Sequence, residues 1–138
     1  MISAVIIDDE TKSREVLKRL ILEIDLDINI VGEANSVESG FELINLEKPQ
    51  LVFLDVEMLD GTGFNLLEKF DQIDFSVVFT TAYDKYAVKA FKYSAIDYLL
   101  KPIGIEELES AVLEVKKGIE KEVNYHNQIR ALLDNNKE

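Results

Sequence analysis

Residues 51–58 of this 138-residue chain read LVFLDVEM. Four apolar residues run directly into Asp55, and so short an apolar run is typical of a strand buried inside a sheet. Residues 4–10, AVIIDDE, repeat the layout, with Asp8 and Asp9 after the apolar run. In an open α/β sheet, ligands bind at the carboxyl ends of the strands. Both stretches therefore predict a strand that presents acids at a functional edge.

Further apolar runs alternate with segments of helical spacing along the whole chain. The expected strands are 4–7, 28–34, the run that ends before Asp55, 77–80 and 97–100. The expected helices are 12–23, one that begins after Ser36 as N-cap and stops before Pro49, a short one around 64–70, 84–94, and a long one from 105. In the helix over 84–94, we expect Tyr83, Ala87, Ala90 and Phe91 to face the core. Five such alternations predict an α/β fold with a parallel sheet and helices on both faces.

Composition excludes several classes of protein. The formal net charge is −12, which argues against direct binding of nucleic acid, because phosphate binding needs a basic surface. There is no cysteine, so disulfides, thiolate metal sites and cysteine nucleophiles are excluded. The first residues do not read as a signal peptide, and no apolar run reaches the roughly 20 residues of a membrane span. We expect a cytoplasmic domain with no membrane partner.

The acids at the strand ends predict a metal site. Asp8, Asp9 and Asp55 would converge, because the first and third strands are neighbours in a doubly wound sheet. Like charges at that distance raise one another's pKa and destabilise the fold unless a cation joins them. Mg²⁺ binds through one or two carboxylates and keeps waters for a phosphate. The alternative is that residues 8–10 only cap the helix that follows.

The same constellation indicates phosphoryl chemistry. A carboxylate beside Mg²⁺ can attack phosphorus and form an aspartyl phosphate. The phosphoryl oxygens then need neutralisation and a hydroxyl donor, roles that suit Lys101 and one of Thr80 and Thr81, since alternation points only one threonine at the site. The single histidine, His126, lies far along the chain, so the phosphodonor must come from outside. We also hypothesise a cis peptide between Lys101 and Pro102.

The sequence resembles the receiver domain of bacterial two-component response regulators over nearly its whole length. The motifs that carry the resemblance, in the family's order and spacing, are Asp8-Asp9, FLDVEM at 53–58, Thr81-Ala82 and Lys101-Pro102. Residues 79–84, 86–91 and 95–102 resemble the LytTR (LytR/AlgR) branch. The resemblance implies a flavodoxin-like, doubly wound five-stranded parallel sheet of order 2-1-3-4-5 with five helices.

The resemblance also implies roles for the acids. Asp55 would accept a phosphoryl group from a phosphohistidine on a sensor histidine kinase. Mg²⁺ would be bound directly by Asp9, through water by Asp8, and by Asp55 and the backbone carbonyl of Glu57. Such a domain is a regulatory switch, and it catalyses only its own phosphorylation and dephosphorylation.

Three further residues take roles by the same resemblance. Thr81 and Lys101 would hold the phosphoryl oxygens, and Tyr98 would swing inward as Thr81 moves. The alternative for Tyr98 is a half-buried strand tyrosine with no switching role. Phosphorylation adds charge and acceptor oxygens, and would bias the face of the fourth helix, fifth strand and fifth helix towards a homodimer.

The chain departs from the family's pattern at two points. Leu59 stands where proline is usual and Gly61 where an apolar residue is common, so the loop after Asp55 is expected to be more mobile. LytTR regulators continue into a DNA-binding domain, which residues after 136 cannot encode. We expect a receiver domain at 1–122 and, at 123–138, a helical extension or linker towards an effector domain, through which alone DNA would be bound. The apolar spacing from Ile119 to Leu133 is too irregular to predict a coiled coil.

Three alternatives stay open at this point. A phosphatase resembling haloacid dehalogenases also uses an aspartate nucleophile with Mg²⁺, but after its first strand. A flavodoxin-like flavin protein would need a Ser/Thr/Gly-rich phosphate loop where this chain has acids. A receiver-like domain that is never phosphorylated would act purely by binding partners.

Overall fold

The computed structural model describes residues 1–135. The strands are β1 (Ile2–Ile7), β2 (Ile28–Ala34), β3 (Leu51–Leu54), β4 (Glu57–Met58), β5 (Gly61–Thr62), β6 (Ser76–Thr81) and β7 (Asp97–Leu100). The helices are α1 (Thr11–Ile24), α2 (Val37–Glu47), α3 (Gly63–Glu68), α4 (Ala87–Phe91) and α5 (Ile105–Asn135), with a 3₁₀ turn, η1 (Asp84–Tyr86), before α4.

The central sheet has the predicted topology. Its order is β2-β1-β3-β6-β7, all parallel, which is 2-1-3-4-5 when only these five strands are counted. The register pairs Ile7 with Leu54, Leu54 with Phe79, and Thr81 with Leu100. The strands therefore end at one edge, and the polar residues that follow them meet there.

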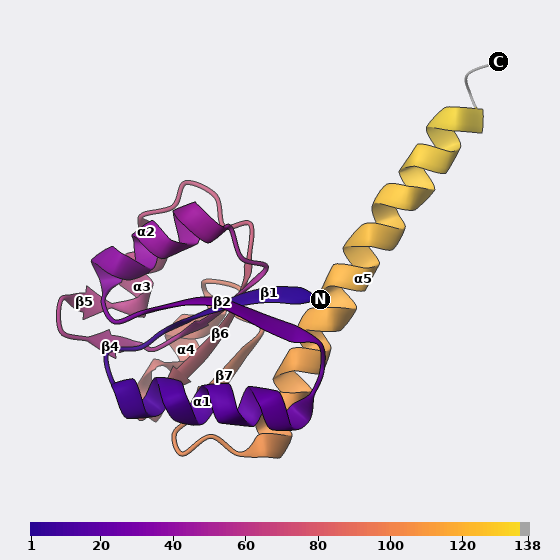
Figure 1. Cartoon of the computed structure of the whole chain (residues 1–138). Coiled ribbons are helices and arrows are strands. Elements are labelled where there is room, and N and C mark those ends of the chain that lie inside the picture. The colour runs from indigo at the N-terminus through magenta and orange to yellow at the C-terminus, as the bar shows by residue number, and fades with distance from the viewer. Residues whose placement is uncertain (136–138) are drawn as a thin grey trace.

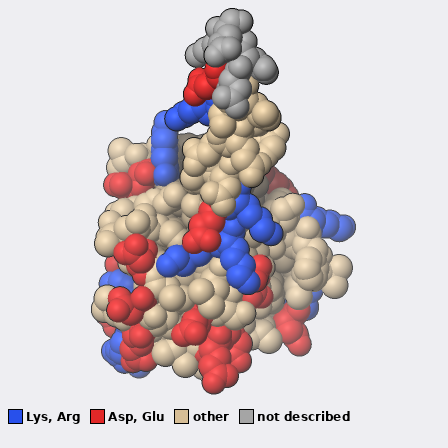
Figure 2. Space-filling model, turned by 90° about the vertical axis from the view of Figure 1, so that its right-hand side faces the viewer, with Lys and Arg blue, Asp and Glu red and all other residues tan. Residues whose placement is uncertain are grey.

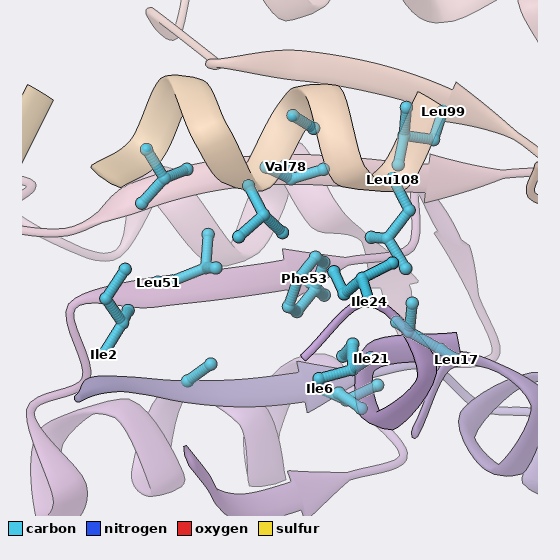
Figure 3. Packing of buried hydrophobic residues seen from close by; sticks show 14 residues of the cluster. Ile2, Ile6, Leu17, Ile21, Ile24, Leu51, Phe53, Val78, Leu99 and Leu108 are labelled. Atoms are coloured by element: carbon cyan, nitrogen blue, oxygen red, sulfur yellow. The ribbon is translucent and has the colours of Figure 1, made fainter. Parts of the chain in front are cut away.

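Helices cover both faces of the sheet, as Figure 1 shows. Side chains alternate along each strand, so Ile6 and Phe53 point to one face while Val5 and Val52 point to the other. The first face packs against α1 and α5, whose Leu17, Ile21, Leu108 and Val112 close a fully apolar layer (Figure 3). The second face packs against α2, α3 and α4. The sheet, whose carboxyl edge carries the acids, is thus packed against helices on both of its faces.

The predicted helix over 84–94 is wrong in its extent. The segment forms only η1 and the five-residue α4, and Ser94 then adopts a left-handed φ of 56°. That conformation is unfavourable inside a helix of L-residues, so it marks the end of the helical segment.

The predicted buried side of this helix is also wrong in part. Ala90 is buried as expected, but Phe91 is 80% exposed and Tyr83 45% exposed. The position facing the sheet is filled by other rings, because Phe64 stacks on Tyr93 with centroids 5.2 Å apart. Ala90 and Tyr93 pack into the cluster on this face of the sheet, and Phe91 is left in solvent.

The loop after Asp55 forms regular structure, and its expected mobility stays a prediction. β4 and β5 form a small antiparallel hairpin, and Asp60 at its tip accepts hydrogen bonds from the backbone N–H of Val37 (2.9 Å) and of Glu38 (3.2 Å). These donors hold the pKa of Asp60 below its ordinary value. Ser36 caps α2 as predicted, accepting from the N–H of Ser39. The start of α2 is thereby tied to the loop that follows Asp55.

Helix α5 extends well beyond the body of the domain (Figure 1). Leu108, Val112 and Val115 are buried, while every residue from Glu120 to Asp134 is exposed. The predicted boundary near residue 122 does not coincide with a break in the helix. The last residues of the predicted extension, 136–138, lie outside the described residues. Among residues 1–135, no helix is both long and apolar enough to cross a bilayer.

Candidate phosphorylation and metal site

Two buried acids lie side by side at the carboxyl edge of the sheet. Asp8 follows β1 and Asp55 follows β3, and these strands are paired. The N–H of Asp55 donates to the carbonyl of Ile7 (2.9 Å), and that of Asp8 to the carbonyl of Ala34 (3.0 Å). The exposed fractions of Asp8 and Asp55 are 3% and 4%. The sheet register itself therefore fixes these two acids in place.

Lys101 joins the two acids. Its Nζ lies 2.8 Å from Oδ2 of Asp8 and 3.3 Å from Oδ2 of Asp55. Its backbone N–H donates to the carbonyl of Thr81 (2.8 Å), which anchors the residue at the end of β6. The peptide between Lys101 and Pro102 is cis, as hypothesised from the sequence. The lysine occupies the position in which a cation between the carboxylates is needed.

Burial sets the electrostatics of the site. It raises the pKa of Asp55 from 3.8 to about 6; the charge of Lys101 acts in the opposite direction, and that of Asp8 raises the pKa further. Burial also disfavours the ammonium of Lys101, but the hydrogen bonds and charges of Asp8 and Asp55 outweigh it and raise the pKa of the lysine. One lysine therefore does not fully compensate the buried acids, and a further cation would stabilise their charged forms.

The acids after β1 meet the requirements of a hard divalent cation. Asp8, Asp9 and Glu10 each offer one carboxylate oxygen, and these oxygens lie within 4.8 Å of one another. Asp8 also accepts from the N–H of Glu10 at 2.9 Å, so it supports the turn before α1, but no side chain caps α1 itself. Capping alone thus does not account for the acids, and the donor set fits Mg²⁺.

Thr81 and Tyr98 converge on one backbone segment. Thr81 is fully buried, and its Oγ1 accepts from the N–H of Tyr83 at 3.5 Å. Tyr98 is half-buried beside Phe79, and its hydroxyl donates to the carbonyl of Tyr83. Thr80, the alternative hydroxyl, is buried as well. The two predicted switch residues are therefore coupled through Tyr83.

Sequence reasoning missed a contact across the mouth of the site. The hydroxyl of Tyr86 donates to the carboxylate of Glu57, and Lys85 Nζ lies 4.0 Å from the same carboxylate. This contact joins the β4–β5 hairpin to η1, and it raises the pKa of Tyr86. The sequence singles out Glu57 only for its backbone carbonyl. A tyrosine 29 residues away leaves no periodic signal, so only the fold reveals the pair.

The structure thus brings most of the predicted residues together. Lys101 contacts both Asp8 and Asp55, and Asp9 follows Asp8 at the same edge; the carboxylates close enough to share an ion are those of Asp8, Asp9 and Glu10, without Asp55. Thr81 ends the neighbouring strand. The individual roles of these residues stay predictions.

Comparisons with known proteins agree with this geometry. Residues 4–113 match the family model described as the response regulator receiver domain. The chain is 37% identical over 133 residues to the sensory transduction protein LytT of Bacillus anthracis, with 94% of this chain and 53% of that protein covered. It is 40% identical over 116 residues to the sensory transduction protein LytR of Staphylococcus haemolyticus, with 83% and 45% covered.

Solved structures give the same fold. The receiver domain of AraT, a response regulator from Geobacillus stearothermophilus, matches with a TM-score of 0.78 at 29% identity, covering 88% of this chain and 97% of that one. The response regulatory domain of MrkE from Klebsiella pneumoniae also gives a TM-score of 0.78, at 25% identity, with 86% and 98% covered.

A receiver domain is a signalling domain and not a classical enzyme, so the phosphatase and flavin alternatives find no support. The chain spans about half the length of the curated relatives it matches. Its sequence match, topology and acidic edge agree: the chain belongs to the response regulator receiver domain family, with relatives of the LytT/LytR type.

Proposed function

We propose that this domain is a phosphorylation-dependent switch in which Asp55 accepts a phosphoryl group from a phosphohistidine on a sensor histidine kinase. The observation that supports this most directly is the placement of Asp55, which is buried, adjacent to Asp8 and in contact with Lys101. In the transfer, a carboxylate oxygen of Asp55 bonds to phosphorus while the P–N bond of the phosphohistidine breaks. The imidazole leaves and takes a proton from solvent.

Side chains of the domain would assist that transfer. Lys101 would neutralise the phosphoryl oxygens and Thr81 would donate a hydrogen bond to them, because Lys101 Nζ contacts Asp55 and Thr81 ends β6, the strand next to β3. Asp8, Asp9, Asp55 and the backbone carbonyl of Glu57 would hold Mg²⁺. When bound, the ion would supply the charge compensation that one lysine does not provide. The domain would catalyse only its own phosphorylation and dephosphorylation.

Thr81 and Tyr98 would transmit the effect of phosphorylation to the surface of the domain. A shift of Thr81 towards the phosphoryl group would disturb the hydrogen bond to Tyr83 N and, through Tyr83, the hydroxyl of Tyr98. Tyr98 lies on β7 next to α4, where Phe91, Val88 and Leu100 are exposed. We propose that this face of α4, β7 and α5 forms a phosphorylation-dependent homodimer.

The domain would act on an effector. We propose a receiver at residues 1–122 and an extension at 123–138 leading to an effector domain, a DNA-binding transcription regulator, in the longer protein. DNA would then be contacted only by that further domain, which agrees with the net charge of −12. We propose a cytoplasmic location, where a kinase and a transcription regulator can both be reached.

Intact-mass spectrometry tests the acceptor. The protein is incubated with acetyl phosphate and Mg²⁺, alongside Asp55→Asn and the exposed-acid control Asp71→Asn. A single phosphoryl adduct on wild type and the control, absent in Asp55→Asn and abolished by EDTA, is expected. An adduct that persists in Asp55→Asn would contradict the assignment. No adduct on wild type from acetyl phosphate or from a phosphorylated histidine kinase, together with no Mg²⁺ binding, would favour a domain that is never phosphorylated.

A further inference from the structure

The distal half of α5 continues a helix face of mixed aliphatic and polar residues, here called the stripe, which is exposed throughout residues 120–134. On the body, Leu108, Val112 and Val115 pack into the core, and Ile119 lies half-buried at its margin. Spacings of four and three residues carry the same stripe onwards through Glu122, His126, Ile129 and Leu133, all exposed. Figure 2 shows this end of α5 standing clear of the body, with uncharged residues over much of its visible surface. Helices in proteins gain most of their stability by packing one face, so a partner that covered the stripe would stabilise this segment.

The stripe is self-complementary about His126. Three residues before and after it stand Val123 and Ile129, and four residues before and after it stand Glu122 and Arg130. Seven residues before and after it stand Ile119 and Leu133, both aliphatic. Positions three, four and seven residues away share one face of a helix. If a second copy of the segment is rotated by 180° about His126 and laid on the first, aliphatic residues therefore meet aliphatic residues, and Glu122 meets Arg130.

We propose that a second copy of this chain covers the stripe, its α5 running antiparallel with the two-fold axis at His126. Ile119 then packs on Leu133 of the partner subunit, and Val123 on the partner's Ile129. Glu122 lies against the partner's Arg130, and each contact occurs twice because the interface is isologous. Glu122 Oε1 and His126 Nε2 are 3.9 Å apart within one helix, so these two side chains already lie on the same face.

A notch at the base of the projecting helix would receive the end of the partner's helix. The cavity has a volume of about 550 Å³, and its apolar lining comes from Ile73, Phe75, Ile119 and Val123. In the antiparallel register, the partner's Leu133 reaches Ile119 at this notch. Asp74 and Glu122, also in the lining, add negative charge at the notch, which would suit the partner's Arg130.

The antiparallel direction follows from the position of the domain body, which covers the first part of the stripe. Residues 108–119 of the stripe already pack against the sheet of their own domain. A parallel partner using the same stripe would bring its domain to the side that this body occupies. In the antiparallel arrangement, the two bodies lie at opposite ends of the helix pair and do not compete for space. This interface uses only the distal half of α5 and no residue of α4 or β7, so we expect it to form without phosphorylation.

Charge swapping tests the register. Sedimentation equilibrium of the unphosphorylated 138-residue protein should show a dimer. Glu122→Arg alone and Arg130→Glu alone each place two like-charge pairs in the interface and should raise the dimer Kd about tenfold or more. The double variant E122R/R130E should restore the wild-type Kd, and Asn124→Arg, on the opposite face of the helix, should leave it unchanged. A monomeric wild type, or a double variant no better than either single one, would overturn the proposal.

Single cysteines test the direction, because the chain has none of its own. Under mild oxidation, His126→Cys should form a disulfide-linked dimer, since the two copies meet at the axis. Leu133→Cys should not, because its copies lie roughly 21 Å apart in the antiparallel pair, 14 residues at 1.5 Å each. Equal cross-linking at both positions would indicate a parallel pair and would contradict the proposal. Cross-linking at neither position would show that something other than a second copy covers the stripe.

Discussion

The two sides of the proposed phosphoacceptor site are built differently. On one side, β1 and β3 hold Asp8 and Asp55 between fully buried strands, with backbone hydrogen bonds to their neighbours. On the other side, the edge strand β7 and the five-residue α4 leave Val88 76% and Phe91 80% exposed. Regions with few buried apolar contacts open most easily. We therefore propose that the chemistry takes place on the first, more buried side, called the rigid side below, and that the conformational response belongs to the other, called the mobile side.

Replacing Lys101, on the rigid side, should have the largest effect, a fall in the rate at which Asp55 is phosphorylated. Lys101→Met removes the cation that contacts both Asp8 and Asp55 and that would neutralise the phosphoryl oxygens. Removing one such group typically costs about 100-fold or more in rate. We expect a fall of that size in the rate of adduct formation with acetyl phosphate and Mg²⁺, followed by intact mass. Lys12→Met, an exposed lysine near Lys101, is the control and should react like wild type.

Asp55 should weaken the fold at neutral pH. Because its pKa is raised from 3.8 to about 6, the folded protein keeps a proton that the unfolded chain has already lost between these values. The free energy of unfolding therefore falls as pH rises from about 4 to about 6, by an upper limit of about 3 kcal/mol. Without Mg²⁺, Asp55→Asn should be about 2–3 kcal/mol more stable than wild type at pH 7.5 and equal to it near pH 3.5.

Urea unfolding across this pH range, in EDTA, measures that difference. Asp71→Asn serves as a control, since the side chain of Asp71 is exposed. A gap between wild type and Asp55→Asn that stays constant from pH 3.5 to 7.5 would show that ionisation of Asp55 is not its cause.

Removing the hydrogen bond between Tyr86 and Glu57, which joins the two sides, should have the smallest effect, on the rate at which the phosphoryl group is lost. Tyr86→Phe removes the hydroxyl that links η1 to Glu57 over the mouth of the site, and water should then reach the aspartyl phosphate more readily. We expect the phosphoryl group to be lost about two- to fivefold faster, because one hydrogen bond to a charged group holds this contact. Tyr93→Phe removes a hydrogen bond of the same kind, to Glu68, away from the site. If both variants lose the phosphoryl group at the same rate, the contact over the mouth plays no part.

The sequence predicts the rigid side better than the mobile one. Apolar runs that end in Asp8 and Asp55 are enough to place both acids, because a parallel sheet brings the ends of its strands together. The cis peptide before Pro102 was anticipated as well. These features depend on local sequence and on one topological rule.

The mobile side depends on contacts that no local pattern encodes. Helical spacing predicts Phe91 in the core, but Phe91 is 80% exposed, and it is Tyr93 that packs there, stacked on Phe64. The hydrogen bond between Tyr86 and Glu57 joins residues 29 positions apart. The capping of α2 by Asp60 likewise depends on a hairpin that only the folded chain forms.

Hydrogen exchange on phosphorylated and unphosphorylated protein, measured by mass spectrometry, tests the central claim most directly. An aspartyl phosphate at Asp55 should change exchange in residues 83–100, which cover η1, α4 and β7, and leave β1 and β3 protected in both states. Changes confined to α1 and α2, or an adduct at Asp55 with no change in residues 83–100, would contradict the division between a rigid chemical side and a responsive one.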